Sequence, residues 1–564
     1  MNFSAGKKLW SFIIVVFILI AVNFLAATFH YRLDLTNEKR FTISSPVKKI
    51  LKSLNDIVEV DIFLKGDLPS GFKKLAGTST ELLQEFQEYA NGKVRYRLIS
   101  PEEIIPGTTR TYADTLSSLG IVPINLKVQL KAGEQSQYVY PAALVHYQQR
   151  ILPVSLYSGP QLISNIELNS AEALLEYKFA DAINKIKENE KPLVAYSVGN
   201  GEPTGTNVYD LIENVLKKDY SLFTINIESE PVIPDTFKVL MIVKPKVSFS
   251  DAEKLKIDQY VMRGGKVLWF IDRLEAEMDS LRIKNQVIAY DRNLNLEDLL
   301  FKYGVRINPD LVMDLQCDFL PFDVNGNKQF EFLHWNYFPL FESKQNNVIN
   351  KNLGLVAGKF VNSLDTVSAP GIDKTILLSS SANARTIETP ALISGEENRN
   401  APADQAFQKK DIPVAVLLEG KFTSLYKNRV SQAMIDTITN YGTPFMTQCI
   451  HENKMIIVAD GDIVLNGVTQ NQPLPMGVNP FTIGSQYEYQ FANKQFVENC
   501  IEYLVNNAGL SEARSKDYTL RLLDPKRIAT EKTTWQIINI VLPVISIIFF
   551  GLIYQWWRRK KYRT

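Results

Sequence analysis

The stretch VLMIVKPKVSFSDAEKLKIDQYVMRGGKVLWFI, residues 239–271, decides the fold class of this chain. It contains an apolar run, a charged amphipathic segment and a second apolar run, in that order. Ser250 and Glu253 have the spacing of a capping box at a helix start, and Gly264-Gly265 is a typical helix stop. Strand, helix and strand in this order predict two parallel strands joined by a crossover helix.

The same alternation continues on both sides of this stretch. Before it we expect a strand at 193–198, a helix at 207–218 and a strand at 221–227. After it we expect strands at 375–378, 414–418 and 455–458 and a closing helix at 494–506. Apolar strands that alternate with amphipathic helices indicate a parallel sheet covered on both faces. The fold class is therefore α/β.

A smaller α/β unit precedes the larger one. The spacing of apolar residues predicts these elements, in chain order: helix 46–54, strand 58–64, helix 78–90, strand 94–99, and a hairpin of 126–130 with 138–147. Thr78 and Glu81 have capping-box spacing at the start of the second helix. We expect a small thioredoxin-like or related domain. Since it has no Cys-x-x-Cys, a redox role has no support.

Both ends of the chain carry uncharged apolar runs, residues 9–29 and 533–557, long enough to cross a bilayer as helices. Lys7 and Lys8 precede the first run, and a basic tail follows the second. Basic flanks favour the cytoplasmic side, so we expect both termini inside and the body outside the cytoplasm. A cleaved signal peptide is the alternative for the first run, but its length favours an uncleaved anchor.

These signals divide the chain into six segments. They are an N-terminal transmembrane anchor (1–35), a small α/β domain (36–168), a connecting helix (169–190), a larger α/β ABC-transporter auxiliary domain (191–512), a membrane-proximal segment (513–532), and a C-terminal transmembrane helix with a basic tail (533–564).

Composition excludes several classes of function. Lys and Arg number 62 against 61 Asp and Glu, so no basic field favours nucleic acid. The three cysteines are too few for a disulfide framework: Cys500 fits a buried core position, and a Cys317–Cys449 disulfide stays open. The four histidines have no zinc-site spacing. We therefore expect no metal and no cofactor.

Two local patterns are candidates for a ligand cleft. The loop GNGEPTG, residues 199–205, follows a predicted strand and precedes a predicted helix, where backbone amides can hold an anion. Its spacing differs from the dinucleotide pattern, so a plain tight connection is the favoured interpretation. Acidic residues also follow two predicted strands, where α/β sheets bind ligands, although they are ordinary in turns too. The candidate cleft residues are Asn200, Gly201, Glu202, Asp272, Asp460 and Asp462.

Motifs for catalysis are missing from the sequence. The segment Gly66–Gly71 approaches a P-loop, but Phe72 stands where the lysine is required. No G-x-S-x-G and no H-E-x-x-H occur. We therefore assign no catalytic, cofactor-binding or metal-binding residues, and we expect the chain not to be an enzyme.

Several longer stretches resemble a known family. They are residues 295–317 (NLEDLLFKYGVRINPDLVMDLQC), 337–340 (YFPL), 414–422 (VAVLLEGKF), 460–462 (DGD) and 520–524 (LRLLD), and the C-terminal span followed by RRKKY. Together they resemble the GldG family, the gliding-motility-associated ABC-transporter proteins of Bacteroidetes. Residues 254–265 are similar to the wider group of ABC-transporter auxiliary proteins.

The resemblance implies a non-catalytic, substrate-binding-like subunit in the inner membrane that works with a separate permease and a separate ATPase in gliding motility. It also implies contact with membrane lipid and with other gliding or envelope proteins. The larger domain is expected to be similar to sugar-binding or amidotransferase-like folds. A solute- or sugar-binding protein with a defined small ligand is the alternative, and an amidotransferase-like hydrolase is a weaker one.

Overall fold

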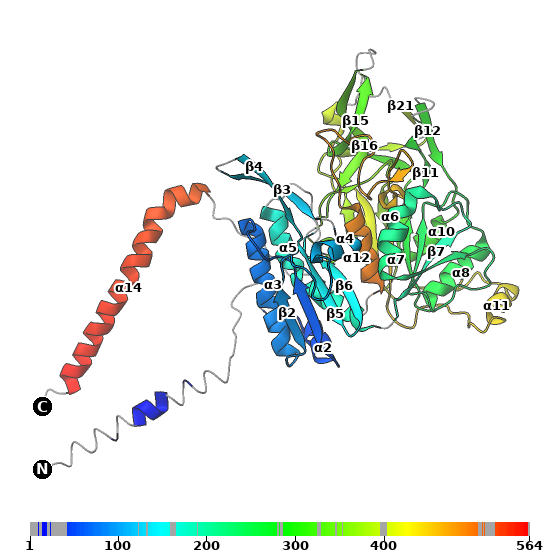
Figure 1. Ribbon diagram of the computed structural model, residues 1–564. Coiled ribbons are helices and arrows are strands. Elements are labelled where there is room, and N and C mark those ends of the chain that lie inside the picture. The colour runs from blue at the N-terminus through cyan, green and yellow to red at the C-terminus, as the bar shows by residue number, and fades with distance from the viewer. Residues whose placement is uncertain are drawn as a thin grey trace, which may run out of the picture. The chain divides into compact units, whose positions relative to one another are not determined.

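The computed structural model describes the following residues: 10, 14–19, 23, 42–121, 123–130, 133–157, 165–188, 190–278, 281, 286–323, 329–343, 347–351, 353–394, 403–505, 510, 513 and 525–561. The chain forms two compact units, residues 1–516 and residues 517–564 (Figure 1). Each is described by itself below.

A seven-stranded sheet lies at the centre of the first unit, with strand order β19-β22-β23-β10-β9-β7-β8. Its strands are β7 (Leu193–Val198), β8 (Ser221–Asn226), β9 (Val239–Val243), β10 (Lys266–Phe270), β19 (Ile372–Ser379), β22 (Pro413–Gly420) and β23 (Asn453–Val458). The five strands from β8 to β23 are parallel, as the sequence predicts. Strand β22 is antiparallel to β23, and β19 is antiparallel to β22, so these two strands extend the sheet through antiparallel pairs that the sequence pattern does not indicate.

The opening stretch folds as predicted. Helix α8 (Asp251–Met262) begins after Ser250, whose side chain accepts from the Glu253 amide while the Glu253 carboxylate accepts from the Ser250 amide. The helix ends at Gly264, which has φ +98°, and a Cβ at Gly265 would lie 2.3 Å from the Tyr260 ring. Glycine is therefore required at this stop by both conformation and space.

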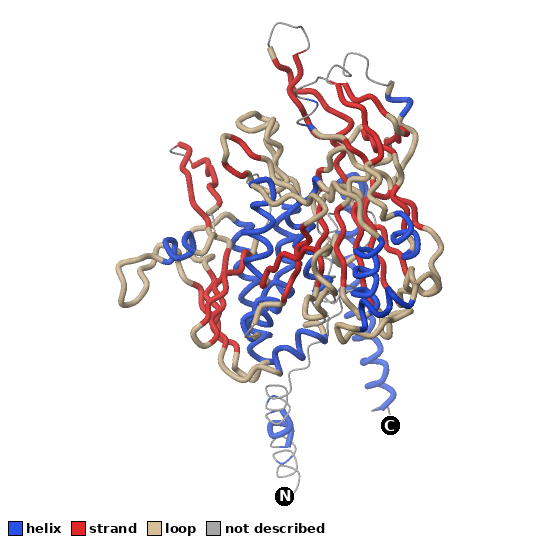
Figure 2. The backbone as a smooth tube through the Cα atoms, turned by 90° about the vertical axis from the view of Figure 1, so that its right-hand side faces the viewer, coloured by secondary structure: helices blue, strands red, loops and turns tan. Residues whose placement is uncertain are grey.

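Successive residues of β10 face opposite sides of the sheet, and both sides are buried. Leu268 and Phe270 pack in one core, which also contains Phe496 of α12 (Asn493–Val505). Trp269 packs in the other core with Tyr260 of α8. Burial on both faces explains why β9 and β10 have continuous apolar sequences rather than alternating ones. The strands lie among helices in Figure 2.

Further strands lie in the chain between β10 and β22, and the sequence analysis did not predict them. They are β11 (Leu274–Glu275), β12 (Gln286–Asp291), β13 (Val305–Ile307), β14 (Asp310–Asp314), β15 (Cys317–Asp323), β16 (Phe330–Phe341), β17 (Val356–Ala357), β18 (Leu364–Thr366), β20 (Ala384–Glu388) and β21 (Ala391–Ser394). Helix α10 (Glu297–Tyr303) lies among them in sequence. An aromatic core that includes Trp335 and Tyr337 stabilises part of this region.

The N-terminal part contains a four-stranded sheet of order β2-β1-β5-β6. Its strands are β1 (Val58–Ile62), β2 (Val94–Leu98), β5 (Ala142–Tyr147) and β6 (Arg150–Ser155). Its helices are α2 (Ser45–Lys52), α3 (Ser70–Tyr89), α4 (Tyr112–Ser118) and α5 (Asn165–Lys187). Strand β1 is parallel to β2 and antiparallel to β5.

Two predictions in this part are wrong. Helix α3 begins at Ser70, so Thr78 lies inside it and donates to the Lys74 carbonyl instead of capping a start. Burial of Phe72 and Leu75 outweighs the low helix propensity of the two glycines in this first part.

The strand expected at 138–147 is two strands. Its first residues belong to β4 (Gly133–Val139), which pairs with β3 (Ile124–Leu130), whereas its last residues form β5. Pro141 lies between β4 and β5, and because proline has no amide hydrogen it cannot continue a ladder. Gly133 and Glu134, expected as the turn, lie in β4.

The three cysteines are free and buried, so the Cys317–Cys449 disulfide left open by the sequence does not form. The Cys449 thiol lies 3.3 Å from the Val261 carbonyl oxygen. Cys500 lies in α12 within the core, as predicted.

The chain segment after α12 returns to the N-terminal part. Leu510 and Ala513, near the C-terminal end of the body, are buried in the same core as Ile43 and Val47, which lie near its N-terminal end. The Ser44 amide donates to the Glu176 carboxylate of α5 at 2.7 Å. The chain therefore enters and leaves the body through one core.

The second unit contains helix α14 (Pro525–Lys561), orange to red in Figure 1. It includes Thr534–Lys561, a segment long and apolar enough to cross a membrane. The helix begins before the expected residue 533. The first expected span, residues 9–29, lies mostly outside the described residues.

Replacing Ser250 by alanine should lower the protection of the first turn of α8 by about 1 kcal/mol, because the Glu253 amide loses the hydroxyl that accepts its hydrogen bond. Hydrogen–deuterium exchange of the full chain measures this change. Ser248→Ala, two residues away and exposed, is the matched control. Equal exchange in the two variants would contradict the capping role.

Candidate functional site

The candidate site lies at the carboxyl edge of the parallel strands. Counted along the chain, the strand order β8-β7-β9-β10-β23 is 2-1-3-4-5, so the direction of winding changes between β7 and β9. Ligands of doubly wound sheets bind at such a switch point. The segment 199–202 follows β7, Lys244 follows β9, Asp272 follows β10 and Asp460 follows β23. All six predicted cleft residues therefore belong to loops at this edge.

A buried ionic cluster occupies the part of the edge next to β9, β10 and β23. The Lys244 Nζ atom lies 3.1 Å from Asp272 Oδ2, 2.8 Å from Asp462 Oδ1 and 3.3 Å from Glu277 Oε2. Only 3% of the Lys244 side chain is exposed. One ammonium group thus joins the ends of three strands.

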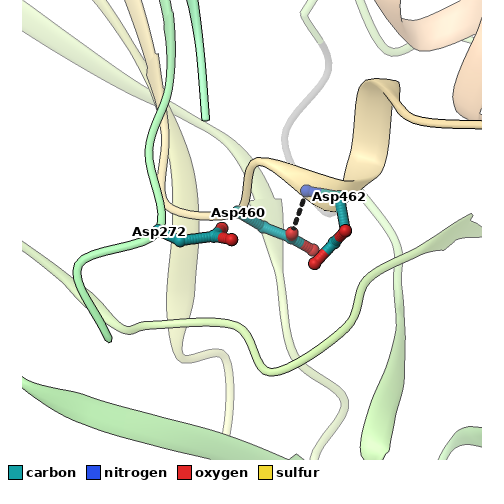
Figure 3. Close-up of side chains that lie close together, drawn as sticks. All are labelled: Asp272, Asp460 and Asp462. Carbon is teal, nitrogen blue, oxygen red and sulfur yellow. Dashed lines mark hydrogen bonds between the residues drawn. The ribbon is translucent and has the colours of Figure 1, made fainter. Parts of the chain in front are cut away.

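Asp460 holds the loop of this cluster in place. Its Oδ1 accepts from the Asp462 amide at 2.7 Å, the bond drawn as a dashed line in Figure 3, and its Oδ2 accepts from the Lys359 amide at 2.9 Å. The Gly461 amide donates to Asp272 Oδ1. Backbone donors therefore fix two of the three carboxylates.

The backbone at this cluster is adapted to close approach. Lys244 has φ +44°, which is uncommon for a residue with a side chain. A Cβ at Gly461 would lie 2.6 Å from the Lys244 Cβ, so only glycine fits there. The two loops consequently approach closely, and the Lys244 side chain between them is almost fully buried.

Burial and mutual repulsion set the charges of the carboxyl groups. Burial raises the pKa of Asp460 well above its ordinary value, and the neighbouring Asp272 and Asp462 raise it further. Burial likewise raises the pKa of Asp272. For Asp462, the attraction of Lys244 outweighs burial and lowers the pKa. Burial opposes the charged form of Lys244, but the surrounding carboxylates outweigh it and raise the pKa of the ammonium.

The sequence analysis missed the cationic half of this cluster. Lys244 directly follows the apolar run of β9, the same position that Asp272 has after β10, and that position is the signal that could have identified it. Glu277 extends the cluster outward to Arg292 at 2.8 Å and to Lys246 at 3.6 Å. No local motif marks Glu277 or Arg292, because their contacts depend on the tertiary fold.

The three aspartates have the chemistry of a cation site, since their ligand oxygens lie within 4.8 Å of one another. However, the Lys244 ammonium lies within 3.1 Å of two of them. It already supplies the positive charge that a metal would bring. The arrangement fits an internal ionic lock, and we assign no metal to it.

The loop after β7 forms the other part of the edge. Gly199 has φ +122° and Gly201 has φ +79°, and a Cβ at Gly201 would lie 3.1 Å from the Lys246 Cβ. The Asn200 carbonyl accepts from the amides of Lys246 and Val247, at 2.7 and 2.9 Å. Backbone conformation and close packing against the loop after β9 therefore account for both glycines.

Two buried acceptor atoms in this loop have no hydrogen-bond partner in the described part of the chain. They are Asn200 Oδ1 and Glu202 Oε1, in side chains that are 4% and 7% exposed, although the buried Ser197 side chain also interacts with the Glu202 carboxyl group. Burial raises the pKa of the Glu202 carboxyl group, while its other oxygen accepts from the Asn200 amide at 2.7 Å. Unpartnered buried acceptors are costly, so this loop can take a hydrogen-bond donor.

Thiol chemistry has no support at this edge. Burial raises the pKa of Cys317 to about 12 and that of Cys449 to about 11. Both thiols are therefore protonated near neutral pH and poor nucleophiles.

The fold and this edge define a mixed α/β protein with a topological switch point in its central sheet and an apolar C-terminal helix. The chain belongs to the family described as an ABC-type uncharacterized transport system, whose model matches residues 191–500. Residues 37–146 match a domain of unknown function, DUF7088. The family is one of ABC-transporter auxiliary proteins, which supports a transport-associated auxiliary role with permease and ATPase partners in general.

An uncharacterized protein of Borreliella burgdorferi is 19% identical over 550 residues, with 94% of each chain covered. Two solved structures were also matched. The mmIFT52 N-terminal domain is 13% identical with a TM-score of 0.31, covering 56% of this chain and 98% of that one. An exo-beta-1,4-mannosidase, Op5Man5 from Opitutaceae bacterium strain TAV5, is 9% identical with a TM-score of 0.18, covering 76% and 51%. TM-scores this low carry no argument about fold or function.

Replacing Lys244 by methionine should destabilise the protein by about 3–5 kcal/mol at neutral pH, because it leaves buried carboxylates without their cation. The substitution also removes the cause that lowers the pKa of Asp462, so that this pKa rises above its unfolded value. An acid with a raised folded pKa favours the folded state at low pH. The loss of stability of Lys244→Met relative to the unsubstituted protein should therefore be smaller at about pH 5.5 than at about pH 7.5.

Thermal unfolding of the full chain at both pH values measures this effect. Lys246→Met is the matched control, since that lysine is 48% exposed and reaches only Glu277 at 3.6 Å. A Lys244→Met deficit that does not exceed the control, or that grows on acidification, would show that the ammonium does not balance these carboxylates.

Proposed function

We propose that this chain is a membrane-anchored, non-catalytic auxiliary subunit of an ABC-transporter complex. The observation that carries the proposal is the family match over residues 191–500 in a chain without a P-loop motif. A transport complex needs ATP hydrolysis, so a separate subunit must supply it, beside a separate permease. Helix α14, with its apolar segment Thr534–Lys561, supplies the anchor.

Described residues from near both ends of the body lie in one core, which supports a role in transmitting motion. Leu510 and Ala513 lie in the core with Ile43, so a displacement of either membrane end acts first on the N-terminal α/β part. Lys185 of α5 forms ion pairs with Asp181 at 2.9 Å and with Asp219, after β7, at 3.6 Å. Helix α5 would thereby pass the displacement to the central sheet.

The proposal also includes the membrane topology of the chain and its specific role in the cell. The basic residues before residue 9 and after residue 557 favour an inner-membrane location with both termini cytoplasmic and the body periplasmic. Resemblance to the GldG family supports a role in gliding motility, with other gliding or envelope proteins as further partners. The six segments proposed from the sequence remain part of this proposal. So does a thioredoxin-like small domain, with which the strand order β2-β1-β5-β6 is in keeping. The larger domain is proposed to be amidotransferase-like.

Removing residues 525–564 should abolish co-purification of the permease and ATPase with the tagged chain from its own membranes, because one of the two proposed anchors is lost and the body is then held at its N-terminal end alone. Replacement of the apolar segment by an unrelated apolar helix of equal length is the control. Recovery with that helix assigns α14 an anchoring role only, whereas no recovery assigns it a docking role. Full motility restored by a soluble fragment of residues 36–532 would overturn the anchored-subunit proposal.

A second candidate function is solute binding at the switch-point edge. The unpartnered acceptors Asn200 Oδ1 and Glu202 Oε1 favour it, because a ligand with hydroxyl or amide donors would satisfy them. Sugars have such donors. The ionic cluster with Asp272, Asp460 and Asp462 would then stabilise the neighbouring loops rather than contact the ligand.

For this second function, a sugar should raise the unfolding temperature of the full chain. Glu202→Gln should remove this rise, because the side-chain oxygen that accepts from the Asn200 amide is kept and the other acceptor is replaced by an NH2 donor. Asp462→Asn, in the ionic cluster, is the comparison variant and should lower the unfolding temperature without removing the sugar-induced shift. An absence of any shift with sugars, nucleotides and divalent ions would favour the scaffold role alone.

A further inference from the structure

A cavity of about 530 Å³ lies apart from the ionic cluster. Its walls come from the segment after β10, from α10 and β13, and from the loop that follows β22. Ile271 and Arg273 line it, whereas Asp272 between them reaches the Lys244 ammonium. The two features therefore use opposite sides of the same extended segment. The volume is that of a typical small-molecule site.

The floor of the cavity is apolar. Ile271, Leu296 and Val305 line it and are 2%, 3% and 0% exposed. Phe301 of α10 also lines it and is 55% exposed. A ligand that covered the Phe301 ring would gain from removing its apolar surface from water, and the buried floor would offer it an apolar wall to pack against.

The rim of the cavity is basic. Lys302, Arg306 and Arg429 line it, and all three are exposed. Within the described part of the chain none of them forms an ion pair, although Asp365 lies opposite Arg306 in the β13–β18 ladder (Val305–Ile307 with Leu364–Thr366).

The acidic residues of the lining are already engaged. Asp298 pairs with Lys254 at 3.0 Å, and Glu297 lies 3.8 Å from Arg273. Arg273 itself donates to Asp291 at 2.8 Å. The available charge at the rim is therefore positive, from Lys302, Arg306 and Arg429.

We propose that this cavity binds an anionic amphiphile: an apolar chain or ring on the floor, and one carboxylate or phosphate head at the rim. A neutral apolar molecule would leave the basic rim without a partner. A wholly polar anion would leave its polar groups against the apolar floor, where they find no hydrogen bonds. Guanidinium groups bind carboxylate and phosphate heads through paired hydrogen bonds, which suits Arg306 and Arg429. The inference stands independently of the proposed transport role.

Isothermal titration of the full chain in zwitterionic lipid nanodiscs tests this proposal with three probes of equal chain length. They are decanoate, decyl phosphate and the uncharged decanol, with empty nanodiscs as the background. We expect saturable binding of at least one of the two anions beyond the background, and weaker binding of decanol. Binding of only one anion identifies the head group that the rim accepts.

Variants separate the cavity from the rest of the surface. Arg429→Ala should weaken binding of the anion about tenfold, the value of one charge-assisted hydrogen bond. Lys427→Ala is the matched control, because this exposed lysine lies in the same loop but does not line the cavity. Leu425→Trp should abolish binding by filling the space, and circular dichroism melts establish that each variant is folded.

Three results would overturn the proposal. The first is a heat of titration with either anion that is no greater for the protein in nanodiscs than for empty nanodiscs. The second is decanol binding as tightly as both anions, which would leave the basic rim without a role. The third is an Arg429→Ala variant that is folded and binds as tightly as Lys427→Ala.

Discussion

The charge balance around Lys244 is the interaction on which the functional edge depends. A single ammonium, almost without contact to water, joins Asp272 after β10, Asp462 after β23 and Glu277 beyond them. Buried carboxylates without a cation are strongly destabilising, so these strand ends can lie together only while the lysine stays in place. The cluster holds the carboxyl edge closed beside β9, and the loop after β7 is the part of the edge that keeps unpartnered acceptors.

The body is organised so that its anchors and its candidate sites lie in different parts. Ile43 and Leu510, from near the two ends of the body, lie in one core, whereas the switch-point edge and the cavity belong to the central sheet and its neighbours. Membership of an ABC-transport auxiliary family gives this separation a functional sense. Under the proposed function, one part would receive motion from the membrane and the other would respond to it or bind a ligand.

Prediction succeeded where a residue's role depends on its neighbours in sequence. The capping box at Ser250 and the five parallel strands were predicted from local sequence patterns. Asp272 and Asp460 were predicted at the carboxyl edge because each follows a predicted strand, where α/β sheets bind ligands. It failed at α3, where packing of Phe72 overrides two glycines, and at β22, whose apolar run is equally compatible with either direction. A fully buried strand has no local signal for parallel or antiparallel pairing.

The sequence by itself determined the α/β class, the central strands and an apolar helix at the C-terminus, because the period and length of apolar runs are written locally. Only the tertiary structure decided that Lys244 neutralises the aspartates, that Ile43 and Leu510 share one core, and that basic and apolar residues surround a common cavity. Each of these depends on contacts between residues far apart in the chain, whose closeness results from burying both faces of the sheet at once.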